Sequence, residues 1–260
     1  MSNQEKPKLS ELIKSLKTHK DAILILGDKV APNAVKITES SKETFNRKCM
    51  VKSPSKFWEW YNENVFFASP TISNEEVAIN ELIKTGVFKL IINLNNTNHI
   101  NSNSLAQLIE LRGNKTLLRC MTCNSIFEIE SKQGKKATDN VLKCTCGGKI
   151  APTVTMFGEK YREADLDTIK KAIFIEDEDG VKLNTHTIIF VGVDFEEDYM
   201  HELMESYNAI KITMPKEDHY YTVMVCDKDG VSIDYYKPEF ATYEDIAGAI
   251  SRLTDNIKGE

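Results

Sequence analysis

The amino-acid sequence predicts an α/β protein in which a parallel sheet is flanked by helices, with a small cysteine-rich module and a helical module inserted into it. Two observations carry this prediction. Short apolar runs, typical of buried parallel strands, alternate along the chain with amphipathic helical patterns. In addition, four of the six cysteines cluster within residues 120–146, which indicates a separate small module.

The N-terminal part of the chain combines one buried strand with three helices. A helix over residues 9–17, with leucine and isoleucine on one face, precedes a strand over 21–27 that ends at a glycine. The aromatic run of residues 54–67 predicts an amphipathic helix, and residues 74–86 predict another that closes with a glycine. We expect the aromatic side chains to pack in a core.

A second buried strand and a polar loop follow. The strand covers residues 87–94, and the asparagine-rich segment 95–104 then leads into an apolar pattern over 105–113 that fits a helix or a strand. Polar loops after parallel strands are where α/β proteins bind ligands. A solvated asparagine loop without a ligand is the alternative.

The last third of the chain repeats the α/β pattern. Residues 186–193 predict a third buried strand, followed by a helix around 195–208 and a short strand over 209–213. Residues 219–236 read as a hairpin joined through Asp-Gly, and an amphipathic helix over 243–257 closes the sequence.

Composition argues against two classes of partner. The 33 lysines and arginines face 39 acidic residues, a net charge of -6 without a long like-charge block, so nucleic acid and anionic membranes are not expected partners. Residues 1–20 lack the apolar core of a secretion signal, and the longest apolar runs are too short to span a bilayer. The sequence therefore predicts a cytoplasmic protein.

The cysteine cluster has metal-ligand spacing. A C-x-x-C pair and a C-x-C pair are separated by twenty residues, which allows four thiolates to converge on one tetrahedral Zn²⁺. The predicted ligands are Cys120, Cys123, Cys144 and Cys146. Four thiolates leave no position for water or substrate, so the predicted zinc is structural. Free buried cysteines are the alternative reading.

Several stretches resemble the sirtuins, a family of NAD-dependent protein deacylases. Residues 144–160, CTCGGKIAPTVTMFGEK, resemble the sirtuin run from the second cysteine pair into the Val-x-x-Phe-Gly-Glu strand. Residues 57–61, FWEWY, resemble the aromatic stretch of its helical module. IELRGN at 109–114 stands in the place of Glu-Leu-His-Gly, and TIIFVGVDF at 187–195 in the place of the late Gly-Thr-Ser strand.

The resemblance, which runs in order from about residue 20 to 213, implies a fold and its division. It implies a Rossmann-like large domain formed by residues 20–115 and 153–257, a helical module at 38–80 and a zinc-ribbon module at 116–152. A hairpin after residue 213 is not expected of the family.

The resemblance also implies a reaction whose key residues are replaced here. Sirtuins use a histidine as general base on a ribose hydroxyl of NAD, and Arg112 stands at that position, seventeen residues after Asn95. A guanidinium stays protonated and cannot accept a proton near neutral pH. Asn95 matches the family's asparagine, but Leu94 and Thr97 replace the glutamine and aspartate around it.

Two glycines match the NAD site of the family, but the residues next to them differ from the family's. Gly27 and Gly192 match family glycines that line the NAD cleft. Asp28 and Lys29 replace the small residues of the phosphate loop, and Asp194 replaces a serine near the adenosine end. A carboxylate beside phosphates is bulky and repulsive, so these residues argue against NAD binding.

Three functional hypotheses follow. The first is a sirtuin-like zinc protein that has lost NAD-dependent deacylation and acts as a binding or regulatory module. The second is a divergent but active deacylase, NAD hydrolase or ADP-ribosyl transferase that uses Asn95, with Asp28, Asp194 or His99 as base. The third is a zinc-ribbon protein that meets nucleic acid through basic residues at 132–136, which the net charge of -6 disfavours.

A peptide site is one function that can outlast the family's chemistry. In sirtuins the strand that corresponds to residues 152–159 pairs through its backbone with an extended peptide. Such pairing needs few specific side chains. The residues that would form it are Val154, Phe157, Gly158 and Glu159. A plain core strand, with Val154 and Phe157 buried, is the alternative.

Overall fold

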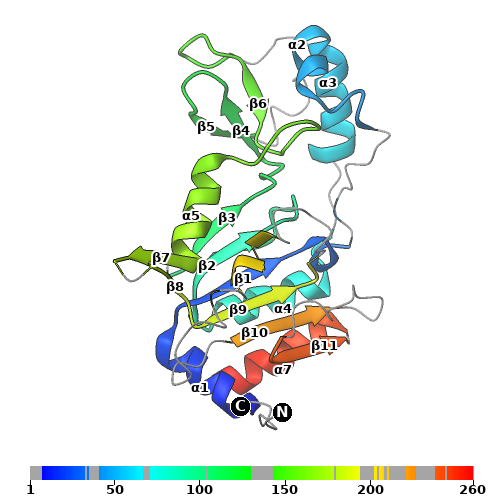
Figure 1. Cartoon of the computed structure of the whole chain (residues 1–260). Coiled ribbons are helices and arrows are strands. Elements are labelled where there is room, and N and C mark those ends of the chain that lie inside the picture. The colour runs from blue at the N-terminus through cyan, green and yellow to red at the C-terminus, as the bar shows by residue number, and fades with distance from the viewer. Residues whose placement is uncertain are drawn as a thin grey trace.

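The main sheet of the molecule is parallel throughout. The computed structural model describes residues 8–32, 34, 41–66, 71–102, 105–129, 143–178, 180–193, 202–203, 205–207, 210, 221–226, 238–243 and 245–259. The sheet has the strand order β11-β10-β9-β1-β2-β3 (Figure 1). Its strands are β1 (Ala22–Leu26), β2 (Phe88–Asn93), β3 (Gln107–Glu110), β9 (Thr187–Val191), β10 (Tyr221–Cys226) and β11 (Phe240–Tyr243). The predicted parallel sheet is confirmed, and the 105–113 pattern forms a strand.

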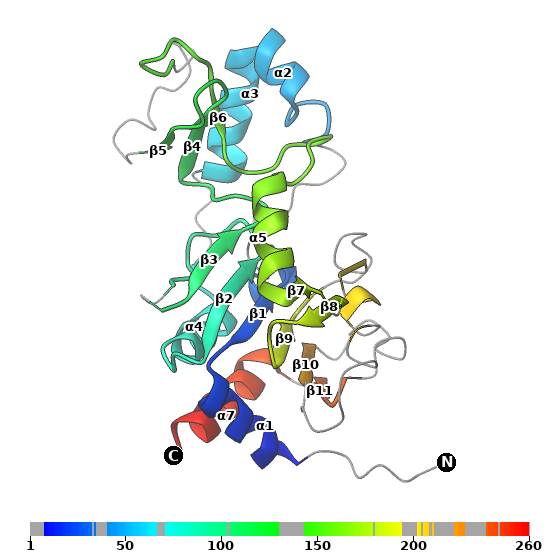
Figure 2. The ribbon, with the colours of Figure 1, turned by 60° about the vertical axis from the view of Figure 1, so that its left-hand side comes forward.

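Helices cover both faces of this sheet, as predicted. Along β1, Leu24 and Leu26 face one apolar core and Ile23 and Ile25 face the other, which explains why the whole strand is apolar. The first core is closed by α1 (Leu9–His19), α4 (Asn74–Ile83) and α7 (Ile246–Lys258). The second is closed mainly by α5 (Glu163–Ile173), which lies on the other side of the sheet from α4 (Figure 2).

A smaller body lies beyond one end of the sheet (Figure 1). It contains α2 (Arg47–Lys52), α3 (Pro54–Tyr61) and an antiparallel sheet of β4 (Leu117–Cys120), β5 (Ile126–Glu128) and β6 (Ile150–Pro152). These elements share one apolar core, to which both chain segments contribute. Residues 74–80, at the end of the range predicted for the helical module, begin α4 and contribute Ala78 and Ile79 to the core of the large sheet.

The aromatic run packs in the core of this smaller body. Phe57 and Tyr61 are fully buried, and Trp58 is 2% exposed. Phe45 stacks on Phe57, with ring centroids 5.6 Å apart. The helix continues past Tyr61 as a π-helical turn over Asn62–Phe66. The prediction that the aromatic stripe is core packing is confirmed.

Two predictions about strands differ from the structure. The first strand of the predicted hairpin over 219–236 is present as β10, but the hairpin pairing is wrong, because β10 has parallel neighbours on both edges, β9 and β11. The prediction of one strand over 152–159 is wrong: β6 ends at Pro152, and farther along Gly158 has a φ of 79° and Glu159 N–H closes a turn onto Met156 O. The short hairpin of β7 (Phe174–Asp177) and β8 (Gly180–Leu183) was not predicted.

Several predictions concern residues outside the described part of the chain. These are Asp194, the basic residues 132–136, residues 209 and 211–213 of the strand predicted over 209–213, and the second strand of the hairpin. Ile210, the one described residue of that predicted strand, is helical, so the prediction is wrong there. Within the part that is described, no helix has both the length and the apolarity needed to cross a bilayer.

Candidate functional site

The residues predicted to line a ligand cleft meet at the carboxyl edge of the large sheet. Gly27 follows β1 and donates its N–H to Val191 O of β9 at 2.9 Å. Leu94 follows β2 and donates to Leu26 O at 2.8 Å. Gly192 lies directly after β9. The structure thus brings Gly27, Gly192 and the start of the asparagine-rich loop together.

Close backbone packing accounts for both glycines. A Cβ on Gly27 would lie 2.2 Å from Gly192 O and 2.4 Å from Val193 Cα. Gly192 has a φ of 59°, and a Cβ there would lie 2.9 Å from Lys29 Cβ. Only glycine fits two backbones that approach this closely. Their retention in the sequence therefore needs no bound cofactor to explain it.

The two most unusual substitutions at this edge contact each other. Arg112 Nη1 donates to Asp28 Oδ1 at 2.9 Å and to Oδ2 at 2.8 Å. Arg112 follows β3, and Asp28 begins a 3₁₀ turn (Asp28–Val30) after β1, so the pair joins two loops at the carboxyl edge of the sheet. The side chains are 34% and 56% exposed. Sequence reasoning treated these positions separately and missed the pair.

Asn95 lies beneath this edge in a buried polar network. It is 2% exposed, and its Oδ1 accepts from Thr97 N–H at 3.2 Å. Thr97 Oγ1 lies 2.7 Å from that oxygen and 2.6 Å from Glu76 Oε1. The Asn95 Nδ2 is buried and forms no hydrogen bond in the described structure, and the same holds for Asn93 Nδ2. Two buried amide donors therefore remain unused at the end of β2.

Glu76 organises this network from the first turn of α4. It is 1% exposed, and its Oε2 accepts from Ser73 N–H at 2.9 Å and lies 3.0 Å from His99 Nδ1. Ser73 Oγ accepts in return from Glu76 N–H, which completes a capping box. The Ser-x-x-Glu pattern at residues 73–76 is a sequence signal for this capping box, and the sequence prediction did not include it. The loop histidine His99 is thus hydrogen-bonded to a buried carboxylate, although its side chain is still 20% exposed.

A buried lysine lies near this carboxylate. Lys115 is 6% exposed, and its backbone oxygen accepts from Tyr61 Oη at 2.8 Å. Burial lowers the pKa of Lys115, and the charge of Glu76 acts in the opposite direction.

Changing Glu76 to glutamine is expected to lower the free energy of unfolding by about 2 kcal/mol, because an amide cannot accept all three hydrogen bonds of the carboxylate. Glu75 lies in the same turn and is only partly buried, so Glu75→Gln is the matched control, with an expected change of about 0.5 kcal/mol or less. Urea denaturation of both variants measures the difference. Equal stabilities would show that the network around Glu76 contributes nothing to stability.

The four predicted metal ligands converge in the smaller body. The sulfur atoms of Cys120, Cys123, Cys144 and Cys146 all lie within 4.8 Å of one another. Cys120 Sγ lies 3.5 Å from Cys146 Sγ, and Cys123 Sγ lies 3.6 Å from Cys144 Sγ. Ligand sulfurs of a tetrahedral zinc site with bonds of about 2.3 Å lie about 3.8 Å apart. The spacing of the sulfurs therefore fits one metal ion, and the C-x-C pair adapts to it.

Backbone groups support these sulfurs. Cys120 Sγ accepts from Thr122 N–H at 3.4 Å and from Cys123 N–H at 3.5 Å, and Cys146 Sγ accepts from Gly148 N–H at 3.4 Å. Such donors stabilise thiolate ligands. A Cβ on Gly148 would lie 2.7 Å from Cys120 Sγ, so glycine lets the second cysteine turn approach the first.

The predicted peptide segment is only partly extended. Val154 is buried, but Phe157 is partly exposed, so the prediction that both are buried is wrong for Phe157. Phe157 N–H donates to Phe45 O at 3.1 Å, which joins this segment to the start of the α2 region. Gly158 is exposed, and Glu159 is partly exposed. These residues form an accessible turn at the edge of the smaller body.

Comparison with known proteins decides the family. The model of the Sir2 family matches residues 17–181, well over half of the chain. The chain belongs to the Sir2 family. The NAD-dependent protein deacylase 1 of Archaeoglobus fulgidus is 32% identical over 136 residues, 51% of this chain and 54% of that protein. An NAD-dependent protein deacetylase of Caldivirga maquilingensis is 34% identical over 113 residues, 42% of this chain and 44% of that protein.

This Sir2-family chain therefore matches about half the length of these curated relatives, whereas its fold matches solved structures throughout. The crystal structure of a Sir2 homolog–NAD complex superimposes with a TM-score of 0.70 at 20% identity, over 99% of this chain and 97% of the other. The structure of Sir2Tm bound to a propionylated peptide gives a TM-score of 0.67 at 18% identity, over 96% and 98%. The predicted Rossmann-like fold is confirmed.

Proposed function

We propose that this Sir2-family protein does not carry out NAD-dependent deacylation and instead acts as a binding or regulatory module. The contact between Arg112 and Asp28 carries this proposal. At the position of the family's general base, a permanently charged guanidinium donates to a carboxylate and has no lone pair to accept a proton. The base is therefore replaced by an ion pair.

NAD fits the residues of this site poorly. The family's phosphate loop brings backbone N–H groups to the diphosphate, whereas Asp28 adds a carboxylate at that loop, hydrogen-bonded to Arg112. The buried Asn95 Nδ2 supports a retained polar contact. A single donor does not replace the lost ribose and phosphate contacts, so we derive no reaction step through NAD.

Calorimetric titration with NAD tests the proposal. With metal content verified first, we expect no saturable heat up to about 1 mM NAD, which corresponds to a binding free energy weaker than about -4 kcal/mol. We also expect no nicotinamide release with any acyl-lysine peptide. An active relative such as the Archaeoglobus deacylase serves as positive control. Micromolar NAD binding or nicotinamide release would overturn the proposal.

A second candidate function is NAD hydrolysis or ADP-ribosyl transfer. It is favoured by the contact of 3.0 Å between His99 Nδ1 and the buried Glu76 Oε2, because a carboxylate that holds one imidazole nitrogen leaves the other to act as base. Nicotinamide release from NAD without any acyl peptide, abolished by His99→Gln and by Asn95→Ala, would establish this function in place of the first. Absence of release removes it.

We further propose that the four cysteines hold one structural Zn²⁺. The sulfur spacing and the exclusively thiolate donor set support this assignment. A zinc ion with four thiolates supplies no catalysis. It would link the C-terminal end of β4, and the turn after it, to the turn before β6. We also propose that the chain is divided into a large domain, a helical module and a zinc ribbon, and that its location is cytoplasmic.

We propose an extended peptide or another protein as the partner, received at the turn of residues 154–159. The support is the exposure of Gly158 and the partial exposure of Phe157 and Glu159. Two Sir2 structures of the same fold are described as bound to a propionylated and to an acetylated peptide. The net charge of -6 argues against nucleic acid as the partner.

A further inference from the structure

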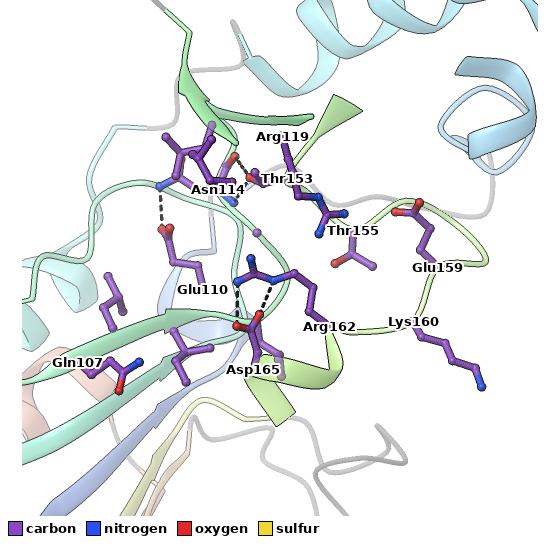
Figure 3. A pocket seen from close by; sticks show the side chains of 16 residues that line it. Gln107, Glu110, Asn114, Arg119, Thr153, Thr155, Glu159, Lys160, Arg162 and Asp165 are labelled. Atoms are coloured by element: carbon purple, nitrogen blue, oxygen red, sulfur yellow. Dashed lines mark hydrogen bonds and ion pairs between the residues drawn. The ribbon is translucent and has the colours of Figure 1, made fainter. Parts of the chain in front are cut away.

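A pocket lies between the edge of the large sheet and the smaller body (Figure 3). Its volume is about 280 Å³, enough for a small metabolite. Its walls are the edge strand β3, β4, the segment 153–160 and the start of α5. Leu111 and Gly113 line this pocket, whereas the Arg112 side chain between them is hydrogen-bonded to Asp28.

Part of the charge in this pocket is already neutralised. Arg162 forms two hydrogen bonds with Asp165, at 2.6 and 2.8 Å. Glu110 Oε1 accepts from Asn114 Nδ2 at 2.7 Å. Burial raises the pKa of Glu110, while the bond from Asn114 acts in the opposite direction. These four side chains are hydrogen-bonded in two pairs, which leaves other side chains of the pocket to contact a ligand.

Arg119, Thr155 and Glu159 remain to contact a ligand. Figure 3 shows the Arg119 guanidinium and the Thr155 hydroxyl pointing toward one another into the pocket, with the Glu159 carboxylate at the same end. Among the described residues, no salt bridge or side-chain hydrogen bond involves Arg119, although it is partly buried. Within the described part of the chain, Glu159 accepts a single long hydrogen bond of 3.4 Å, from Met156 N–H. A cation and an anion thus face one space without forming an ion pair.

Opposite charges that share a pocket but are not paired match a ligand that carries both charges. We propose that this pocket binds a free amino acid, whose carboxylate contacts Arg119 and the Thr155 hydroxyl and whose ammonium group contacts Glu159. A guanidinium prefers a carboxylate as its partner. Leu108 and Leu117 also line the pocket and offer apolar contact to a ligand side chain. A phosphate dianion would meet the charge of Glu159 and is disfavoured.

Calorimetric titration with a panel of proteinogenic amino acids, led by L-leucine, tests this proposal. We expect saturable binding of at least one of them below about 10 mM. The same compound without its ammonium group (4-methylpentanoate for leucine) and without its carboxylate (3-methylbutylamine) should each bind at least about tenfold more weakly, because each loses a charge-assisted contact. Inorganic phosphate should not bind.

Variants assign the binding to these residues. Arg119→Gln and Glu159→Gln should each weaken binding at least about tenfold. Lys160→Gln, whose side chain points away from the pocket in Figure 3, should change it less than about twofold. Metal content and thermal midpoint check that Arg119→Gln, one residue before Cys120, still folds, and Thr155→Val serves if it does not.

Four results would overturn the proposal. These are no amino acid binding to the wild-type protein, equal binding of 4-methylpentanoate, binding of phosphate in its place, or unchanged binding in both Arg119→Gln and Thr155→Val. The outcome does not depend on NAD, so the amino acid site and the proposed function can fail separately.

Discussion

Changing Cys120 to serine is expected to remove the metal and unfold the smaller body. Cys120 is fully buried in the apolar core that also contains Phe57 and Tyr61, so its sulfur joins the metal site to that core. Structural zinc sites of this type bind with about 10–16 kcal/mol at pH 7, which is much of what folds a small module. We expect zinc content to fall from one ion per chain to below half.

The two tryptophans provide a local readout of this unfolding. Trp58 and Trp60 both lie on α3, within the smaller body, so their fluorescence reports on that body and not on the large sheet. Their emission should shift to the red in Cys120→Ser and after chelation of the wild-type protein. Cys49→Ser, a partly buried cysteine outside the cluster, should retain both zinc and emission. An unchanged emission in Cys120→Ser would show that the metal does not hold this body together.

Changing Gly27 to alanine is expected to lower the free energy of unfolding by at least about 3 kcal/mol. The new Cβ would lie 2.2 Å from Gly192 O, and neither backbone can move without disturbing the parallel pair β1–β9. Gly86→Ala is the control. Gly86 has a φ of 72°, but its Cβ would meet only Leu105 Cδ1 at 3.4 Å, so we expect a loss of about 1 kcal/mol.

Chemical denaturation of both glycine variants measures this difference. If Gly27→Ala lowers the free energy of unfolding by less than about 1 kcal/mol, the loops after β1 and β9 can move apart at little cost. In that case close packing would not explain the glycine, and a ligand that needs the backbone of Gly27 would become the better explanation.

The sequence was informative wherever the signal was local. Residues 22–26 and 188–191 are apolar without interruption because the strands they belong to are buried on both faces, and such runs are visible without a structure. The cysteine spacing likewise reflects the two turns that hold the metal ligands. The Asp-Gly signal near residue 229 was local too, but the neighbours of β10 are distant in the sequence, and no turn motif specifies them.

The candidate site was harder to predict because its contacts are between distant residues. Arg112 and Asp28 are 84 positions apart, and each alone reads as a lost catalytic feature. Glu76 and Thr97 are 21 positions apart, and the hydrogen bond that joins them shows only in three dimensions. Sequence reasoning therefore identified which positions had changed, but not that the new side chains are partners.

The strand order gives the contact between Arg112 and Asp28 a further meaning. From β1 the chain adds strands first toward β3 and later toward β11, so the direction of winding reverses between β1 and β9. Such a reversal opens a crevice where α/β proteins hold ligands. The Arg112–Asp28 pair joins the loops after β1 and β3, on the β1 side of this crevice. Its side chains are 34% and 56% exposed, and ion pairs in contact with solvent contribute about 0–1 kcal/mol. The free energy needed to break this contact is therefore small, and added salt should weaken the contact further.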